Sequence, residues 1–69
     1  MKTKKNKIAG YRVYLGMTQK DTAKYLRISP QSYSHKENGY RAFNDHEKVK
    51  LKTLFQRINP DITIDEIFF

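Results

Sequence analysis

Two neighbouring side chains, Ser34 and His35, have the types that nucleophilic catalysis uses, a hydroxyl and a base. Adjacent residues on a helix do not face each other, so this spacing does not make a catalytic couple. The two histidines, His35 and His46, lie far apart, and the chain has no cysteine to complete a zinc site with them. The sequence therefore predicts no enzymatic activity, no metal site and no cofactor.

The basic residues gather in the first part of this chain of 69 residues, whose net charge is +7. Residues 1–43 hold ten Lys or Arg against two acids, giving +8, whereas residues 44–69 hold four against five, giving −1. Each phosphate that a cation neutralises releases counterions, so nucleic acid suits this surface as a partner. A solvated basic surface is the alternative. An anionic membrane fits less well, because no segment pairs a basic face with a strongly apolar one.

Export and membrane signals are missing from the sequence. No apolar run approaches the ~20 residues that span a bilayer, and the first residues lack the apolar stretch of a secretory signal. The absence of cysteine also suits a reducing compartment. We expect a protein of the bacterial cytoplasm.

Local start and stop signals divide the chain into five helices. The last four helices each start at a capping residue, which is followed three residues later by an acid or directly by a proline at the first helical position. These signals stand at Thr18 with Asp21, Ser29 with Pro30, Asn44 with Glu47, and Thr63 with Glu66. The first helix is predicted over about 5–15, ending at Gly16, and the third over about 30–38, ending at Gly39. The fourth helix is predicted to turn a row of apolar side chains towards the core, and this row begins at either Val49 or Leu51.

The second and third helices must cross steeply, because only residues 27–29 separate them. The pattern predicts a compact all-α bundle in which these two helices form a helix-turn-helix. We expect a single helix-turn-helix domain over residues 8–69, preceded by a basic arm over residues 1–7. The arm contains Lys2, Lys4, Lys5 and Lys7. It could track a groove or phosphates, or be a solubilising tail.

Residues 17–39, "MTQKDTAKYLRISPQSYSHKENG", resemble the lambda-repressor and Cro-like helix-turn-helix family. The matching residues are Thr18, Gln19, Ala23, Leu26, Ile28, Ser29, Ser34, Glu37 and Gly39. The resemblance covers about residues 8–68 and implies a five-helix lambda-repressor-like DNA-binding domain. It also implies a structural ion pair between Arg12 and Glu37. The chain departs from the family at Thr22, usually leucine, at Arg27, often a turn glycine, and at Lys36, usually a large apolar residue.

In this family the third helix lies in the major groove. The resemblance implies base contacts from Gln31, Ser32 and His35; the alternative for each is an ordinary exposed polar side chain. It also implies contacts to the DNA backbone near the ends of the second and third helices. These contacts would come from Thr18, Gln19, Ser29, Ser34, Asn38, Tyr40 and Arg41.

A second group of residues could belong to a protein interface. It consists of Tyr14, Tyr25, Lys36, Ile67, Phe68 and Phe69. We expect Tyr14 and Tyr25 to be at least half exposed, and tyrosine is enriched at interfaces, although packing at the edge of the core is the alternative. The apolar C-terminus could likewise close the core or form a dimer patch.

The resemblance implies a small phage or bacterial transcription regulator. The expected function is that of a Cro-like repressor of the lysis–lysogeny switch type, which binds double-stranded operator DNA as a homodimer. The alternative is an antirepressor, a modulator of repression that binds a phage repressor protein with or without DNA. A generic nucleoid or RNA-binding protein would use the charge without reading bases through the third helix.

Overall fold

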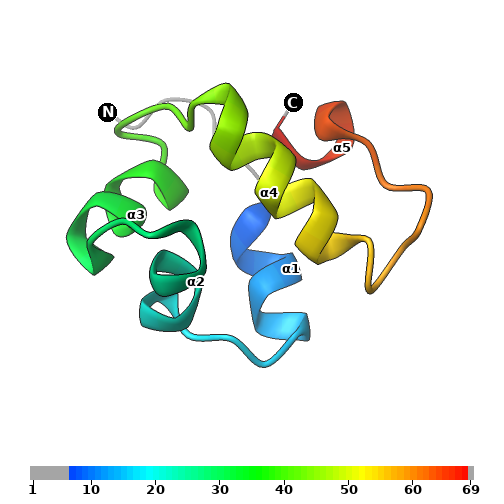
Figure 1. The fold of residues 1–69 in the computed structure, drawn as a ribbon, viewed down its shortest axis with the longest axis horizontal. Helices are drawn as coiled ribbons and strands as arrows, with labels where there is room; N and C mark the ends of the chain where they lie inside the picture. Colours follow the sequence, from blue (N-terminus) through cyan, green and yellow to red (C-terminus); the bar gives the residue numbers. More distant parts are fainter. Residues whose placement is uncertain (1–6, 69) are drawn as a thin grey trace.

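Five α-helices follow one another in the computed structural model, which describes residues 7–68. They are α1 (Ile8–Tyr14), α2 (Gln19–Leu26), α3 (Pro30–Glu37), α4 (Asp45–Phe55) and α5 (Ile64–Phe68). Figure 1 shows α2 and α3 together at one end, with α1 and α4 between them and α5. No strand and no bilayer-spanning helix occur within residues 7–68. The predicted all-α fold, with α2 and α3 as the helix-turn-helix, is confirmed.

Reciprocal hydrogen bonds fix where α2 and α4 begin. Thr18 Oγ1 accepts from the backbone N–H of Asp21, whose carboxylate accepts from the backbone N–H of Thr18, each at 3.0 Å. Asn44 and Glu47 form the same reciprocal pair at 2.8 and 2.9 Å. Because both partners lie within one turn, these helix starts were predictable from local sequence.

Residues in the left-handed region follow each of the first three helices. Gly16 has φ 74° after α1, Gly39 has φ 85° after α3, and Arg27 has φ 60° at the end of α2. Arg27 is the one non-glycine residue with positive φ in the described chain. The first helix begins at Ile8, later than predicted; residues 5 and 6 lie outside the described part.

Within the described residues, ten buried apolar side chains form the core. They are Ile8, Ala23, Leu26, Tyr33, Phe43, Leu51, Leu54, Phe55, Ile62 and Ile67. Leu51, which is fully buried, begins the inward stripe of α4, whereas Val49 is 53% exposed. Tyr11 packs at the edge of this core and stacks on Phe55, with 5.1 Å between the ring centroids. The core therefore joins α1 to the C-terminal part of α4.

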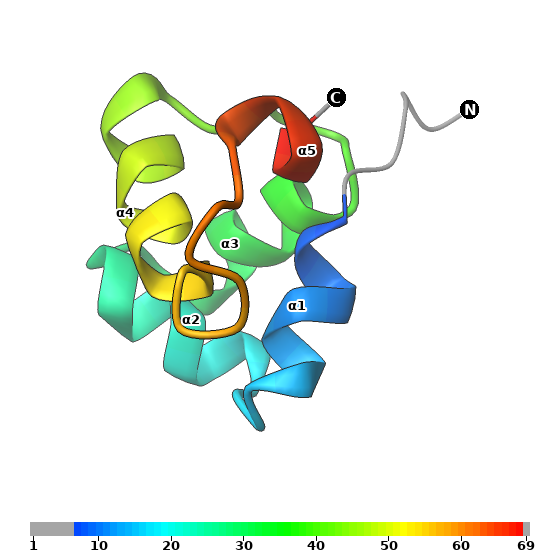
Figure 2. The same cartoon turned by 90° about the vertical axis from the view of Figure 1, so that its right-hand side faces the viewer.

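Ile67 and Phe68, the described part of the apolar C-terminus, pack on the core and are not exposed. Ile67 is fully buried, and Phe68 is partly buried with its ring 5.6 Å from that of Phe43. The backbone N–H of Lys7 donates to the carbonyl of Ile67 at 3.1 Å, which ties α5 to the start of α1. Figure 2 shows α5 above α1. Phe69 lies outside the described residues.

Tyr25 is more buried than predicted. Its hydroxyl donates to the Lys50 carbonyl at 3.1 Å, and the Lys50 ammonium donates back to the Tyr25 carbonyl at 3.2 Å. The same ammonium lies 5.0 Å from the centroid of the tyrosine ring. Tyr25 therefore joins α2 to α4 and is only partly exposed, so the expectation that it is at least half exposed was wrong, and it packs at the edge of the core as the alternative had it.

Candidate nucleic-acid interface

The turn between α2 and α3 combines a strained residue with a capped helix start. Arg27 adopts the left-handed conformation, with φ 60° and ψ 41°. Ser29 Oγ then accepts from the backbone N–H of Ser32 at 3.1 Å, and Pro30 is the first helical residue. These three residues fix the direction in which α3 leaves the turn.

α3 has one polar exposed face and one buried face. Gln31 and His35, which are four residues apart and therefore on the same face, are exposed, and Ser32 is partly exposed beside them. Tyr33 is fully buried and Glu37 is 3% exposed. The structure thus brings the three predicted base-contacting residues together on the side of α3 that faces away from the core.

The residues predicted to contact the DNA backbone flank this face. Thr18, Ser29, Tyr40 and Arg41 are exposed, whereas Gln19, Ser34 and Asn38 are partly exposed. The amide of Asn38 donates to the carbonyl and hydroxyl oxygens of Ser34, at 2.9 and 3.3 Å, and is thereby held at the end of α3. The ring of Tyr40 meets that of His35 edge-on, with 6.4 Å between centroids.

Three exposed basic residues in α2 and at its end were not predicted from the sequence to contact DNA; one of them, Arg27, was noted only as a departure from the family pattern. Lys20, Lys24 and Arg27 occur three and four residues apart in α2 and at its end, and all are exposed. Their spacing of three and four residues places them on one face of a helix, and this spacing could have identified them from the sequence. They add exposed positive charge to α2 and to the turn that leads into α3.

The carboxylate of Glu37, on the buried side of α3, accepts hydrogen bonds from three side chains. Arg12 donates through Nε to Oε2 at 2.8 Å and through Nη2 to Oε1 at 3.3 Å. Gln19 Nε2 donates to Oε1 at 2.9 Å, and the Tyr33 hydroxyl donates to Oε2 at 2.6 Å. Arg12 Nη1 also donates to the Met17 carbonyl at 2.7 Å. The expected pair of Arg12 and Glu37 is therefore present and extends to Gln19, the first residue of α2.

The electrostatics of this cluster follow from its geometry. Burial raises the pKa of Glu37, but hydrogen bonds from Arg12, Tyr33 and Gln19 outweigh it and hold this pKa below its ordinary value of 4.5. Burial and the hydrogen bond to Glu37 raise the pKa of the Tyr33 hydroxyl. Glu37 is thus a carboxylate and Tyr33 a neutral donor at neutral pH.

Lys36, a possible protein-interface residue in the sequence, has a largely covered side chain that is paired within the domain. Its ammonium donates to both carboxylate oxygens of Glu47, at 2.7 and 2.8 Å, and lies 6.0 Å from the ring centroid of Phe43. The two charged side chains are only 13% and 5% exposed. Lys36 therefore joins α3 to α4. Glu47 was identified only as a capping residue, because no local signal connects it with Lys36.

The described residues contain no group of three His, Cys, Asp or Glu side chains that could hold a metal ion. The described residues do form an exposed polar face on α3, which carries Gln31 and His35. On the buried side of this helix, the carboxylate of Glu37 is hydrogen-bonded to residues of α1, α2 and α3. A family model described as Helix-turn-helix matches residues 8–55, from α1 to the end of α4. Comparisons with curated proteins and with solved structures found no significant match.

Proposed function

The chain belongs to the Cro/C1-type helix-turn-helix family, and from this premise we propose that it is a Cro-like repressor that occupies operator DNA through α3. Family membership makes it a DNA-binding transcription regulator whose partner is double-stranded DNA. The family is typically non-enzymatic, and nothing positive in the described residues indicates catalysis. The proposed setting is a phage lysis–lysogeny switch in the cytoplasm of a bacterial host.

The exposed face of α3 is the observation that carries this proposal. Gln31 has the donor and acceptor that pair with adenine, Ser32 suits several bases, and His35 can donate to N7 of guanine. Burial of Tyr33 and Glu37 on the opposite face supports an orientation in which these side chains enter the major groove.

Backbone contacts would set the register of α3 on the duplex. We assign them to Thr18, Gln19, Ser29, Ser34, Asn38, Tyr40 and Arg41. Gln19 would bind phosphate through the backbone N–H at the start of α2, because its side-chain amide already donates to Glu37. We further propose residues 1–7 as a basic arm and residues 8–69 as the domain that binds DNA.

A homodimer would give the repressor a second α3. One small module offers limited specificity, whereas a two-fold dimer reads two half-sites about one helical turn apart. Repression then follows from occupancy, because a dimer bound to an operator excludes another protein from the same DNA.

Footprinting and gel shifts on the DNA upstream of the gene test this function. We expect sequence-specific protection by the purified protein alone, across a range of salt concentrations. Gln31→Ala should weaken discrimination at one base pair by about 1–3 kcal/mol. Gln56→Ala, which removes a glutamine at the end of α4, is the matched control and should bind like the wild type. Equal affinity for all DNA would contradict the proposal.

The antirepressor alternative has lost most of the surface that favoured it. Lys36, Tyr25, Ile67 and Phe68 are covered to a large extent, so that Tyr14 and Tyr40 are the exposed aromatic residues among residues 7–68. The same gel shifts, repeated with the neighbouring phage repressor, distinguish the two functions. A complex that requires the repressor would favour the antirepressor.

A further inference from the structure

A hollow of about 330 Å³ opens on the surface beside α1. Five described residues line it, and we call it the α1 hollow: Lys7, Gly10, Tyr11, Tyr14 and Ile58. The first four of these recur three or four residues apart, so they lie on one side of α1. None of the five belongs to α2 or α3, which separates the α1 hollow from the proposed DNA-binding surface.

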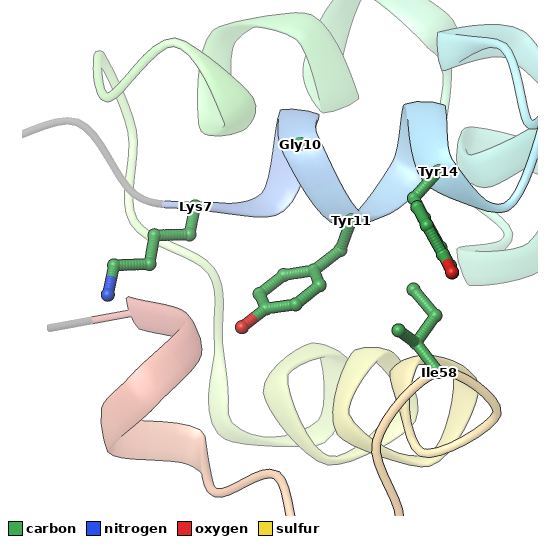
Figure 3. A pocket seen from close by; sticks show the side chains of 5 residues that line it. All are labelled: Lys7, Gly10, Tyr11, Tyr14 and Ile58. Atoms are coloured by element: carbon green, nitrogen blue, oxygen red, sulfur yellow. The ribbon is translucent and has the colours of Figure 1, made fainter.

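The α1 hollow is polar at one end and apolar at the other. Figure 3 shows Lys7 and Tyr14 on opposite sides of it, with Tyr11 between them. The hydroxyl of Tyr11 is directed to the side of Lys7, whereas Ile58 lies on the side of Tyr14. A ligand that fits this arrangement therefore has a polar group at one end and an apolar body at the other.

The polar end holds two hydrogen-bond donors that the described part of the chain does not use. Within residues 7–68, no group accepts a hydrogen bond from the Lys7 ammonium or the Tyr11 hydroxyl. The hydroxyls of Tyr25 and Tyr33, which also pack on the core, both donate within the domain. None of the residues that line the α1 hollow is acidic, and the chain carries a net charge of +7. This end of the hollow therefore favours an anion that accepts from both donors.

The apolar end leaves room for a flat group. A Cβ built at Gly10 meets no atom within 4 Å, so the fold does not require a glycine there. Glycine weakens a helix relative to alanine, but it lets a ligand approach the backbone closely. Tyr14 is 76% exposed, and its ring can stack on another aromatic ring. These features suit an aromatic body.

We propose that the α1 hollow binds a small planar aromatic carboxylate with two fused rings. The carboxylate accepts from the Lys7 ammonium and the Tyr11 hydroxyl, and the rings lie over Gly10 between Tyr14 and Ile58. Lys7 and Tyr14 are seven residues apart, a helical advance of ~10 Å that matches the length of such a molecule.

The size and lining of the α1 hollow fit a small-molecule site. Its volume lies near the lower end of the ~300–1,000 Å³ range of ligand pockets. Such pockets combine a mostly apolar lining with a few polar groups that orient the ligand, as Lys7 and Tyr11 do here. The inference goes beyond the proposed function, because this site requires neither DNA nor α3.

An NMR titration of the full chain with 2-naphthoate tests the site, and 2-naphthamide serves as the neutral probe of the same shape. We expect 2-naphthoate to shift the backbone amide signals of Gly10, Tyr11, Tyr14 and Ile58. Its dissociation constant should be on the order of 0.1–1 mM, as for a ligand of this size in an open site. 2-Naphthamide should bind about fivefold more weakly, because it lacks the ion pair with Lys7. Added salt should reduce this difference.

Variants test the two ends of the hollow separately. Lys7→Gln should weaken 2-naphthoate about fivefold and leave 2-naphthamide unchanged. Its matched control, Lys52→Gln on α4, should change neither affinity. Gly10→Leu should weaken both probes at least about tenfold, because the leucine side chain fills the hollow. The same variant should raise the melting temperature, because leucine favours a helix more than glycine does.

Thr53→Leu is the matched control for Gly10→Leu, because it adds the same side chain at an exposed position of α4. It should leave both affinities unchanged, and circular dichroism should show every variant folded. The proposal is overturned if 2-naphthoate does not bind at millimolar concentration, if the shifts centre outside the lining residues, or if both probes bind the wild type equally. Equal weakening by either control variant also overturns it. None of these measurements uses DNA, so they report on the site independently of the proposed function.

Discussion

At the scale of single residues, Glu37 determines how α3 is held in the domain. Its carboxylate accepts from Arg12 of α1, Gln19 of α2 and Tyr33 of α3 itself. Such a buried anion is stable only while its donors remain, because an unpaired charge in the interior carries a large desolvation penalty. The position of the proposed reading helix is thus coupled to the ionisation of one group.

Acid should therefore destabilise the protein through Glu37. The folded state lowers the pKa of this carboxyl below 4.5, its ordinary value, so the ionised form stabilises the fold above that pH. This contribution is lost as the pH falls from 4.5 through the lower folded pKa. We expect the free energy of unfolding, measured by urea titration, to decrease over this range.

Glu37→Gln separates this effect from general acid denaturation. The variant should lose about 2–4 kcal/mol at pH 7, because Arg12 keeps a partly buried charge without its counterion. Its stability should depend less on pH below 4.5 than that of the wild type. The exposed Asp61→Asn should change neither quantity appreciably. An unchanged pH dependence in Glu37→Gln would contradict this assignment.

At the scale of the elements, the turn between α2 and α3 holds backbone strain. Arg27 occupies the left-handed region, which a residue with a Cβ adopts at an energetic cost. Arg27→Gly should relieve about 1–2 kcal/mol of strain, and the greater freedom of glycine in the unfolded chain should offset about 0.5–1 kcal/mol of this, so we expect a net stabilisation of about 0.5–1 kcal/mol. Lys24→Gly, inside α2, should instead destabilise it by about 1 kcal/mol. Thermal melting of the two variants should shift in opposite directions.

The pair of Lys36 and Glu47 connects α3 with α4. Either Lys36→Met or Glu47→Gln alone leaves a largely buried charge without its partner and should lose about 2–4 kcal/mol. The double variant should recover most of this loss, because methionine packs at a position that suits an apolar residue and glutamine keeps the capping hydrogen bond to Asn44. Urea denaturation of all four proteins gives the coupling free energy. Additive losses would contradict the expected coupling.

These elements also show what could be predicted from the sequence. The starts at Thr18, Ser29 and Asn44 were predicted because each cap binds a group within three residues. The burial of Tyr25 and Lys36 was not, because their partners, Lys50 and Glu47, come from another helix. A hollow lined by Gly10, Tyr14 and Ile58 was not predicted for the same reason, since Ile58 lies far along the chain from the other two.

At the scale of the whole molecule, charge asymmetry should govern the affinity for DNA. Each lysine of the basic arm that contacts a phosphate contributes about 0.9 to the slope of log affinity against log salt. Replacing Lys2, Lys4 and Lys5 by alanine should therefore reduce the magnitude of this slope. Lys52→Ala, on α4, is the control and should leave it unchanged. A slope unaffected by the three replacements would identify the arm as a solubilising tail.

The donors around Glu37 have a final consequence for the thermodynamics of operator recognition. Arg12, Gln19 and Tyr33 hold α3 in place in the free protein. The conformational entropy of this helix is therefore lost when the chain folds and not when it associates with DNA. On the proposed function, binding would then lack the large negative heat-capacity change of a segment that folds on its partner. α3 would meet DNA as a preorganised template, and sequence discrimination would depend on how well each duplex fits a shape that is already set.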